Sequence, residues 1–318
     1  MLRTRLTEAF GLDHPVIQAP MAFAAGGKLA ASVSKAGGLG LIGGAYGDAD
    51  WLDAQFLEAG NTEIGCGFIT WAVKEKRDLV RSVLARNPKA LFLSFGNPEA
   101  LASDCAAADV PLICQIQTVR DARHAIECGA SVLIAQGAEA GGHGESRATF
   151  TLVPEVADLI AKTSPDTLLC AAGGIADGRG LAAALMLGAD GVLVGSRFWA
   201  SEEALVHPNM HEAAVHSNGD DTIQSSVMDI ARRLEWPERY GARVLKNDFT
   251  ERWHDNVASL LENQDVEADK WRDAWTKGDV DVANTFVGEG VGMINTVEPA
   301  AVILHRMVEE AETHLARF

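Results

Sequence analysis

The sequence is short of basic residues, and this shortage excludes some classes of partner. Its 318 residues include 27 Lys and Arg against 44 Asp and Glu, a formal net charge of −17. Nucleic-acid phosphates and anionic membrane surfaces attract positively charged proteins. The charge balance therefore argues against binding nucleic acid or membrane, and we attribute the acidity mainly to solubility.

Cysteine is scarce and unpaired. The five cysteines are Cys66, Cys105, Cys114, Cys128 and Cys170, and no two have the C-x-x-C spacing. An odd, scattered set is typical of reduced structural thiols in a cytoplasmic protein. Several lie in apolar runs, where a thiolate would not be stabilised, so a nucleophilic role is disfavoured.

Other common signals are also missing. The polar start of the chain has no apolar signal-peptide core, and no apolar run is long enough to span a bilayer. No Asp, Glu and His set has the spacing of a metal site. Phosphate-loop, G-x-S-x-G and dinucleotide fingerprints are absent too. We therefore expect a cytoplasmic protein without a metal-centred mechanism.

What the chain does contain is a repeated alternation of short apolar strands and helices. Strands buried on both faces are expected as unbroken apolar runs, and their alternation with helices is typical of a parallel (β/α)₈ barrel. An open, doubly wound sheet is the alternative, because alternation alone does not show closure. The predicted strands are 16–19, 39–42, 64–68, 90–94, 111–115, 131–135, 168–172 and 191–194.

The pattern changes over residues 201–284. Tryptophans become frequent among charged residues, and strand–helix alternation stops. We expect a helical insertion that covers the barrel mouth as a substrate lid, with the barrel formed by residues 1–200 and 285–318. A separate C-terminal helical domain is the alternative, but the short glycine-rich segment 288–292 favours a return of the chain to the barrel.

A loop rich in small residues, 136–144, follows the predicted strand 131–135 and contains His143. Gly141 and Gly142 can adopt positive φ angles and allow a ligand to approach the backbone. An imidazole at the end of a barrel strand could move protons near neutral pH. An exposed histidine in a tight turn is the alternative.

Glycines at the ends of two neighbouring strands indicate a phosphate site. Gly173-Gly174 and Gly195-Ser196 end the last two predicted strands, where barrels commonly bind phosphate. Turns required by packing are the alternative. Together with amide side chains on nearby strands, a phosphate site suits a flat, hydrogen-bonding cofactor such as FMN. The remaining strand-end residues are Ala19, Pro20, Met21, Thr70, Gln115, Gln136 and Ala172.

Several of these segments resemble one known family. The motifs are Ala19-Pro20-Met21, the stretch from Gln136 to His143, Ala172-Gly173-Gly174-Ile175 and the stretch from Leu187 to Phe198. They are similar to those of the nitronate monooxygenases, which were formerly called 2-nitropropane dioxygenases and are FMN-dependent TIM-barrel flavoproteins. FMN-dependent enoyl-ACP reductases and some NAD(P)H:quinone reductases carry similar motifs.

The resemblance implies roles for individual residues. His143 matches the catalytic base, Gln136 would hydrogen-bond the flavin, and the backbone of 19–21 would lie along its ring system. Two features differ from the usual pattern of the family. Gln115 stands where many relatives carry lysine, and residues 144–147, which follow His143, are not the sequence most common there. The ribityl phosphate would be surrounded by Gly141, Gly142, Gly173, Gly174, Gly195 and Ser196.

The implied reaction is the oxidation of alkyl nitronates by O₂ to carbonyl compounds and nitrite. Neutral nitroalkanes would also be substrates if His143 removed the acidic proton beside the nitro group. A flavin-dependent NAD(P)H:quinone or enoyl-ACP reductase is the first alternative, and a non-catalytic flavin-binding module is the second. The sequence leaves the oligomeric state open, a homodimer included.

Overall fold

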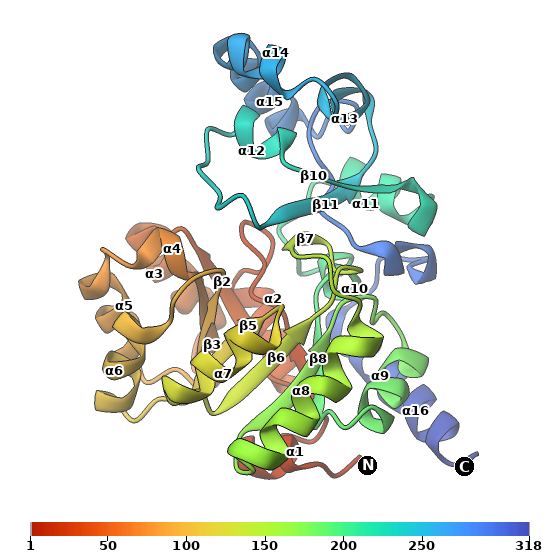
Figure 1. Cartoon of the computed structure of the whole chain (residues 1–318). Helices are drawn as coiled ribbons and strands as arrows, with labels where there is room; N and C mark the ends of the chain where they lie inside the picture. The colour runs from red at the N-terminus through yellow and green to blue at the C-terminus, as the bar shows by residue number, and fades with distance from the viewer. Residues whose placement is uncertain (1, 318) are drawn as a thin grey trace.

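Eight parallel strands form a nearly closed barrel in the computed structural model, which describes residues 2–317 (Figure 1). Their spatial order is β1-β9-β8-β6-β5-β4-β3-β2. A parallel bridge between Ile17 and Leu39 joins β1 to the residues just before β2, which narrows the remaining gap. The strands are β1 (Val16–Gln18), β2 (Leu41–Ala45), β3 (Gly65–Ile69), β4 (Leu91–Ser94), β5 (Leu112–Ile116), β6 (Val132–Gln136), β8 (Leu168–Ala172) and β9 (Gly191–Val194). The predicted (β/α)₈ barrel is therefore confirmed.

Helices follow the strands and cover the outside of the barrel. The N-terminal helix α1 (Arg5–Phe10) instead closes the end opposite the insertion, because Leu6 and Phe10 join the apolar cluster inside the barrel. The outer helices are α2 (Gly27–Lys35), α3 (Ala49–Ala59), α4 (Thr70–Val73), α5 (Arg77–Leu84), α6 (Glu99–Ala107), α7 (Val119–Glu127), α8 (Thr149–Thr163), α9 (Gly178–Met186), α10 (Ser196–Trp199) and α16 (Ala300–Leu315).

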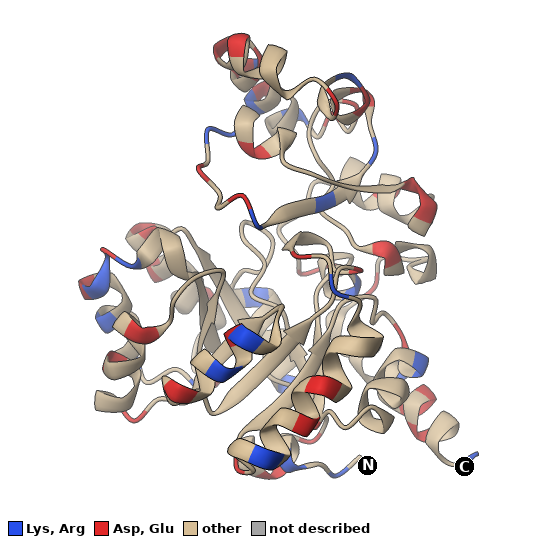
Figure 2. Ribbon diagram, viewed as in Figure 1, with Lys and Arg blue, Asp and Glu red and all other residues tan. Residues whose placement is uncertain are grey.

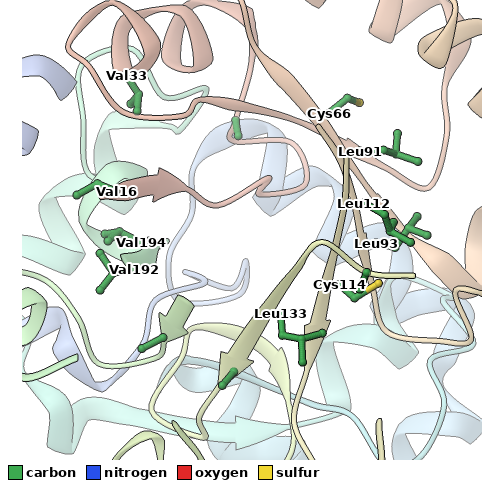
Figure 3. Packing of buried hydrophobic residues seen from close by; sticks show 14 of the residues in the cluster. Val16, Val33, Cys66, Leu91, Leu93, Leu112, Cys114, Leu133, Val192 and Val194 are labelled. Atoms are coloured by element: carbon green, nitrogen blue, oxygen red, sulfur yellow. The ribbon is translucent and has the colours of Figure 1, made fainter. Parts of the chain in front are cut away.

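Alternate residues of each strand are buried on opposite faces, as the two-residue period of a strand requires. In β4, Phe92 points into the barrel, whereas Leu91 and Leu93 pack in the layer between strands and helices. Figure 3 shows Leu91, Leu93, Leu112 and Cys114 gathered in that outer layer. Both faces are apolar, which explains why the strands read as unbroken apolar runs.

In the barrel, charged residues lie on the helices and loops and not on the strands (Figure 2). The eight barrel strands contain no Lys, Arg, Asp or Glu. Burying an unpaired charge is costly, so an uncharged barrel interior is expected on physical grounds. Within residues 2–317, no helix is both long and apolar enough to cross a membrane.

The segment between α10 and α16 lies over the carboxyl ends of the barrel strands (Figure 1). It is largely helical but also contains two strands, which the sequence analysis did not predict. These strands pair with β7 (Gly142–Gly144), the segment that carries His143, in the order β10-β11-β7. The segment comprises α11 (Pro208–Val215), η1 (Gly219–Asp221), β10 (Thr222–Ser225), α12 (Val227–Ala231), β11 (Gly241–Leu245), α13 (Asp248–Trp253), α14 (Val257–Glu262), α15 (Gln264–Lys277) and η2 (Glu289–Met293).

Candidate functional site

A cavity of about 570 Å³ lies between the carboxyl ends of the barrel strands and the segment above them. Its size is within the range of about 300 to 1,000 Å³ common for ligand pockets. The barrel contributes strand-end residues to its wall, whereas Arg232, Trp236, Trp271 and Phe286 come from the segment between α10 and α16 and its return. Apolar and aromatic side chains dominate this wall, so a bound ligand would be shielded from water.

His143 is buried in the cavity wall and held from two sides. It pairs with Ala242 of β11 through the backbone, and the residue is only 8% exposed. Its Nε2 lies 2.8 Å from Oδ2 of Asp229, which is 3% exposed. The indole of Trp236 stacks on the imidazole with 3.3 Å between ring centroids and 6° between planes. The exposed-turn alternative is therefore wrong.

Burial lowers the pKa of His143, an effect that the hydrogen bond to Asp229 opposes. The imidazole is consequently neutral near pH 7. With Nε2–H donating to the carboxylate, the lone pair is on Nδ1, for which residues 2–317 provide no hydrogen-bond partner. Nδ1 can therefore accept a proton, and Asp229 would stabilise the imidazolium that forms.

Asp229 and Arg232 are site residues that the sequence analysis missed. Both lie at or just after α12, and Nη1 of Arg232 is 3.5 Å from Oδ1 of Asp229. The available signal was a single acidic residue inside the apolar stretch 227–231. Buried carboxylates need a partner, but the sequence alone did not indicate that the partner was His143, 86 residues earlier.

Three of the predicted glycines and a serine form a small concave surface on the barrel side of the cavity, here called the glycine cradle, which consists of Gly173, Gly174, Gly195 and Ser196. Gly173 and Gly174 have φ angles of +103° and +71°, which side chains other than hydrogen rarely allow. A Cβ added to Gly195 would meet nothing closer than 3.8 Å. The backbone N–H groups of Gly174, Gly195 and Ser196 find no acceptor within residues 2–317.

These free donors and the open backbone fit a phosphate group. The cavity size, the cradle and the apolar wall together fit a flavin mononucleotide. The helix that follows Gly173-Gly174 does not itself present free N–H groups to this phosphate site. Helix α9 begins four residues later, and the Asp177 side chain accepts hydrogen bonds from its first N–H groups, so that terminus is not free to bind phosphate.

The loop bearing His143 and the chain's return segment also meet here. A Cβ on Gly141 would lie 2.5 Å from the carbonyl carbon of Val287, and one on Gly288 would lie 2.4 Å from the Glu139 oxygen. Only glycine permits this approach. Gly142 lies in the cavity wall with φ +74°. The Glu139 carboxylate accepts hydrogen bonds from Thr149 at the start of α8, which ties the loop to the barrel.

The predicted glutamines form one connected network. Oε1 of Gln136 accepts hydrogen bonds from Nε2 of Gln115 at 2.9 Å and of Gln117 at 2.7 Å. Its Nε2 donates to the carbonyl oxygen of His143 at 3.2 Å. Gln136 thus links the barrel to the histidine loop and keeps one amide hydrogen for a ligand. The sequence analysis predicted Gln115 and Gln136 as site residues but not Gln117.

The remaining predicted residues lie in the wall, with one exception. Ala19, Pro20, Met21 and Ala172 line the cavity. Thr70 does not: it is buried at the start of α4, where it packs beneath the turn at Gly96. Thr70 begins a helix directly after β3 and is not among the residues that line the cavity, so its role in the site stays a prediction.

The cysteines are structural in their setting. All five are free, four of them buried, and burial raises the pKa of Cys66 and of Cys105 to about 12. Such thiols are protonated at neutral pH and poorly nucleophilic. Over residues 2–317, the structure contains no group of three His, Cys, Asp or Glu side chains that could hold a metal ion.

Comparison with known proteins agrees with the resemblance seen in the motifs. A nitronate monooxygenase family model matches residues 3–62 and 58–310. Nitronate monooxygenase npaC from Metarhizium robertsii is 34% identical over 358 aligned positions, covering 99% of this chain and 97% of that protein. The structure of FabK from Thermotoga maritima is 29% identical with a TM-score of 0.83, covering 100% of this chain and 98% of that one.

A third relative acts on a thioester. It is a 5-hydroxy-7a-methyl-1-oxo-octahydro-indene-4-carboxyl-CoA dehydrogenase from Mycobacterium tuberculosis, 33% identical, covering 72% of this chain and 64% of that protein. The family model extends over most of the chain, and the fungal relative extends over nearly all of it. The chain therefore belongs to the nitronate monooxygenase family, a family of flavin-dependent oxidoreductases.

Proposed function

We propose that the protein oxidises alkyl nitronates with O₂ to carbonyl compounds and nitrite, using FMN. The observation that carries the proposal is the buried His143–Asp229 pair, which faces an apolar cavity beside a glycine cradle. A base that is neutral at pH 7 and a water-shielded pocket suit small apolar substrates with an acidic C–H group.

FMN would be held by the glycine cradle at its phosphate and by the 19–21 backbone and Gln136 at its ring system. When bound, FMN supplies the electron acceptor and the reactivity toward O₂ that amino-acid side chains lack. Gln115 supports Gln136 through their hydrogen bond. The protein's own contribution is to orient the substrate, exclude water and control one proton.

His143 controls that proton. Nδ1 would accept the proton on the carbon beside the nitro group, while Asp229 holds Nε2–H and stabilises the resulting positive charge. A preformed nitronate has already lost this proton, so its oxidation would not need His143 as a base. Residues 201–284 would serve as a substrate lid, and the buried, protonated thiols are in keeping with a cytoplasmic protein.

The test is oxygen uptake by the purified protein with ethyl nitronate, propionate 3-nitronate and neutral nitroethane. We expect O₂ consumption and nitrite release with the nitronates, and release of FMN but not FAD on denaturation. Absence of O₂ uptake with all three compounds would contradict the proposal.

A reductase is the second candidate, and the CoA-thioester dehydrogenase among the relatives is the observation that favours it. The same purified protein should be mixed anaerobically with NADH and with NADPH. Rapid bleaching of the flavin, followed by reoxidation with a quinone or an enoyl thioester, would favour this function. Yellow protein inert to every substrate would indicate a flavin-binding module.

A further inference from the structure

Arg232 is a buried cation whose donors are mostly unused. Its side chain is 10% exposed and lines the cavity. Its hydrogen bond to Asp229 is long, at 3.5 Å, and its guanidinium also interacts with the Tyr46 hydroxyl. A guanidinium has five N–H donors in a planar fork, so most of them remain available to a ligand in the cavity.

The guanidinium is enclosed by aromatic rings. Its central carbon lies 5.4 Å from the ring centroid of Phe286, 5.7 Å from that of Trp271 and 6.0 Å from that of Phe23. These rings stabilise the cation and exclude water. A hydrogen bond from a desolvated guanidinium to an anion is therefore stronger than one made in water.

The other arginines of the cavity wall differ from Arg232. The side chain of Arg233 is 52% exposed and pairs with Asp265, and that of Arg272 is 69% exposed and pairs with Asp269. Their charges are screened by water and already neutralised. Of these three arginines, Arg232 is thus the buried one, and its single long contact with Asp229 leaves most of its N–H donors for an anion.

Asp229 places this cation next to the base. Its Oδ2 bonds to His143 and its Oδ1 contacts Arg232, so one carboxylate holds both groups. A substrate with its acidic carbon at His143 would carry its nitro group on the adjacent atom. The two oxygens of a nitro or nitronate group lie in a plane, as in a carboxylate, and match the guanidinium fork.

We propose that Arg232 binds the paired oxygens of the substrate's nitro group, so that the site selects the planar nitronate anion over the neutral nitroalkane. The inference rests on the proposed function and adds the residue that determines the charge of the preferred substrate. A carboxylate at the far end of a substrate such as propionate 3-nitronate also presents two planar oxygens to a guanidinium. The experiment below distinguishes binding of this carboxylate from binding of the nitro group.

The first measurement is calorimetric titration of the flavin-loaded protein with propionate, which has the shape and charge of ethyl nitronate but does not react. Arg232→Met keeps the length of the side chain and removes its charge. We expect it to weaken propionate binding by about 10- to 100-fold, the loss of a hydrogen bond to a charged group. Arg232→Lys should recover part of the affinity, because it keeps the charge but not the fork.

The matched control is Arg252→Met. Arg252 also lies over a tryptophan ring, that of Trp253 at 4.6 Å, but it is exposed and outside the cavity wall. This variant should bind propionate like the wild type. Equal binding by wild type and Arg232→Met, or no detectable propionate binding by the wild type, would overturn the proposal.

Kinetics identify which oxygens are bound. If Arg232 holds the nitro group, Arg232→Met should raise KM by a similar factor for ethyl nitronate and propionate 3-nitronate, with a change below about threefold for nitroethane. A loss confined to propionate 3-nitronate would place the far carboxylate on Arg232 and overturn the assignment. Arginine-dependent propionate binding without any nitronate oxidation would instead reject the proposed function and retain the anion site.

Discussion

Two side chains and burial determine what His143 can do. Asp229 fixes one ring nitrogen, Trp236 covers one face of the imidazole, and burial keeps the ring neutral. The Trp236 indole is itself held by a hydrogen bond from Nε1 to the Tyr46 hydroxyl at 3.1 Å. The imidazole is therefore held in one orientation with Nδ1 left to react, which is the preorganisation that proton transfer requires.

Replacing His143 with asparagine tests the proton step. Asparagine keeps a polar side chain but cannot accept a proton near pH 7, so turnover of neutral nitroethane should fall by roughly 10²–10⁴-fold. FMN content should not change, because the glycine cradle is untouched. Preformed ethyl nitronate is the control, and its oxidation should fall much less. Equal losses on both substrates would show that His143 positions the substrate or the flavin instead.

The pH profile gives a second view of the same residue. Burial lowers the pKa of His143 below its ordinary value of 6.5, so the neutral base persists as the pH falls to 6.5. The kcat/KM for nitroethane should decline only below that point, as protonation removes the base. We expect no such decline in the residual activity of His143→Asn. A midpoint above 6.5 in the wild type would contradict the burial effect.

The lowered pKa of His143 also makes the free energy of unfolding depend on pH. In the unfolded chain, His143 binds a proton at its ordinary pKa, whereas the native state resists protonation. The free energy of unfolding should therefore fall as the pH drops from 6.5 toward the lowered native pKa, and His143→Asn should lack this part of the fall.

Where a local pattern carried the information, the sequence was enough to find residues that line the cavity. The glycine pair 173–174 and the histidine of the 136–144 loop could be found because strand ends and small-residue loops are local signals. Asp229 and Arg232 could not, since their roles depend on a contact between α12 and β7 that no local pattern specifies. Thr70 was chosen because it follows a strand end, but this position does not set the direction of a side chain, and Thr70 is not among the residues that line the cavity.

At the level of elements, the pairing of β7 with β11 holds the histidine loop. The central strand β11 joins β10 on one side and β7 on the other, and Ala242 is the partner of His143. This small sheet connects the barrel to the segment above it. The position of His143 therefore depends on Ala242, which lies 99 residues further along the chain (242 − 143).

Ala242→Pro tests this dependence. Proline removes an N–H group from a central strand and disturbs the ladder. We expect nitroethane turnover to fall at least tenfold, which corresponds to about 1.4 kcal/mol of lost transition-state stabilisation, while flavin stoichiometry stays near that of the wild type. Ala242→Gly, which keeps the N–H group, is the control. Unchanged turnover in the proline variant would show that β11 does not position His143.

The barrel strands were predictable because burial on both faces makes them apolar throughout. Residues 168–172 and 191–194 match β8 and β9, whereas β2 begins two residues later than predicted and includes Gly43 and Gly44. The strands β10 and β11 were missed because their residues are mixed in polarity and their pairing partner is distant. Helix α1 was missed because it is short, and within Arg5–Phe10 only Leu6 and Phe10 are large apolar residues.

For the whole molecule, binding of FMN should raise the free energy of unfolding, and a ligand that makes fewer contacts should raise it less. FMN at 100 times its Kd would stabilise the native state by about 2.7 kcal/mol. We expect FMN to raise the Tm of the flavin-free protein by several degrees and riboflavin, which lacks the phosphate, to raise it less. Differential scanning fluorimetry with both ligands measures the difference.

The cradle accounts for this preference. Gly174→Asp would place a negative charge beside the phosphate, at a position with φ +71° and with Glu139 3.3 Å from the new Cβ. The variant should lose the preference for FMN over riboflavin. Gly11→Asp is the control, because Gly11 also has a positive φ, +60°, but is exposed and has nothing within 4 Å of an added Cβ. Retained preference in Gly174→Asp would place the phosphate elsewhere.

The last helix also bears on how the molecule is made. Helix α16 packs against α9 and α2, so the outer layer of the barrel is completed by residues synthesised after the whole segment above the mouth. At about 5 to 20 residues per second, the apolar surface of α9 would wait roughly 6 to 26 seconds on the ribosome for the end of α16 to be synthesised, and that of α2 roughly 14 to 56 seconds. During that interval the nascent barrel is open on one side, which makes it a substrate for chaperones and a point of vulnerability to aggregation.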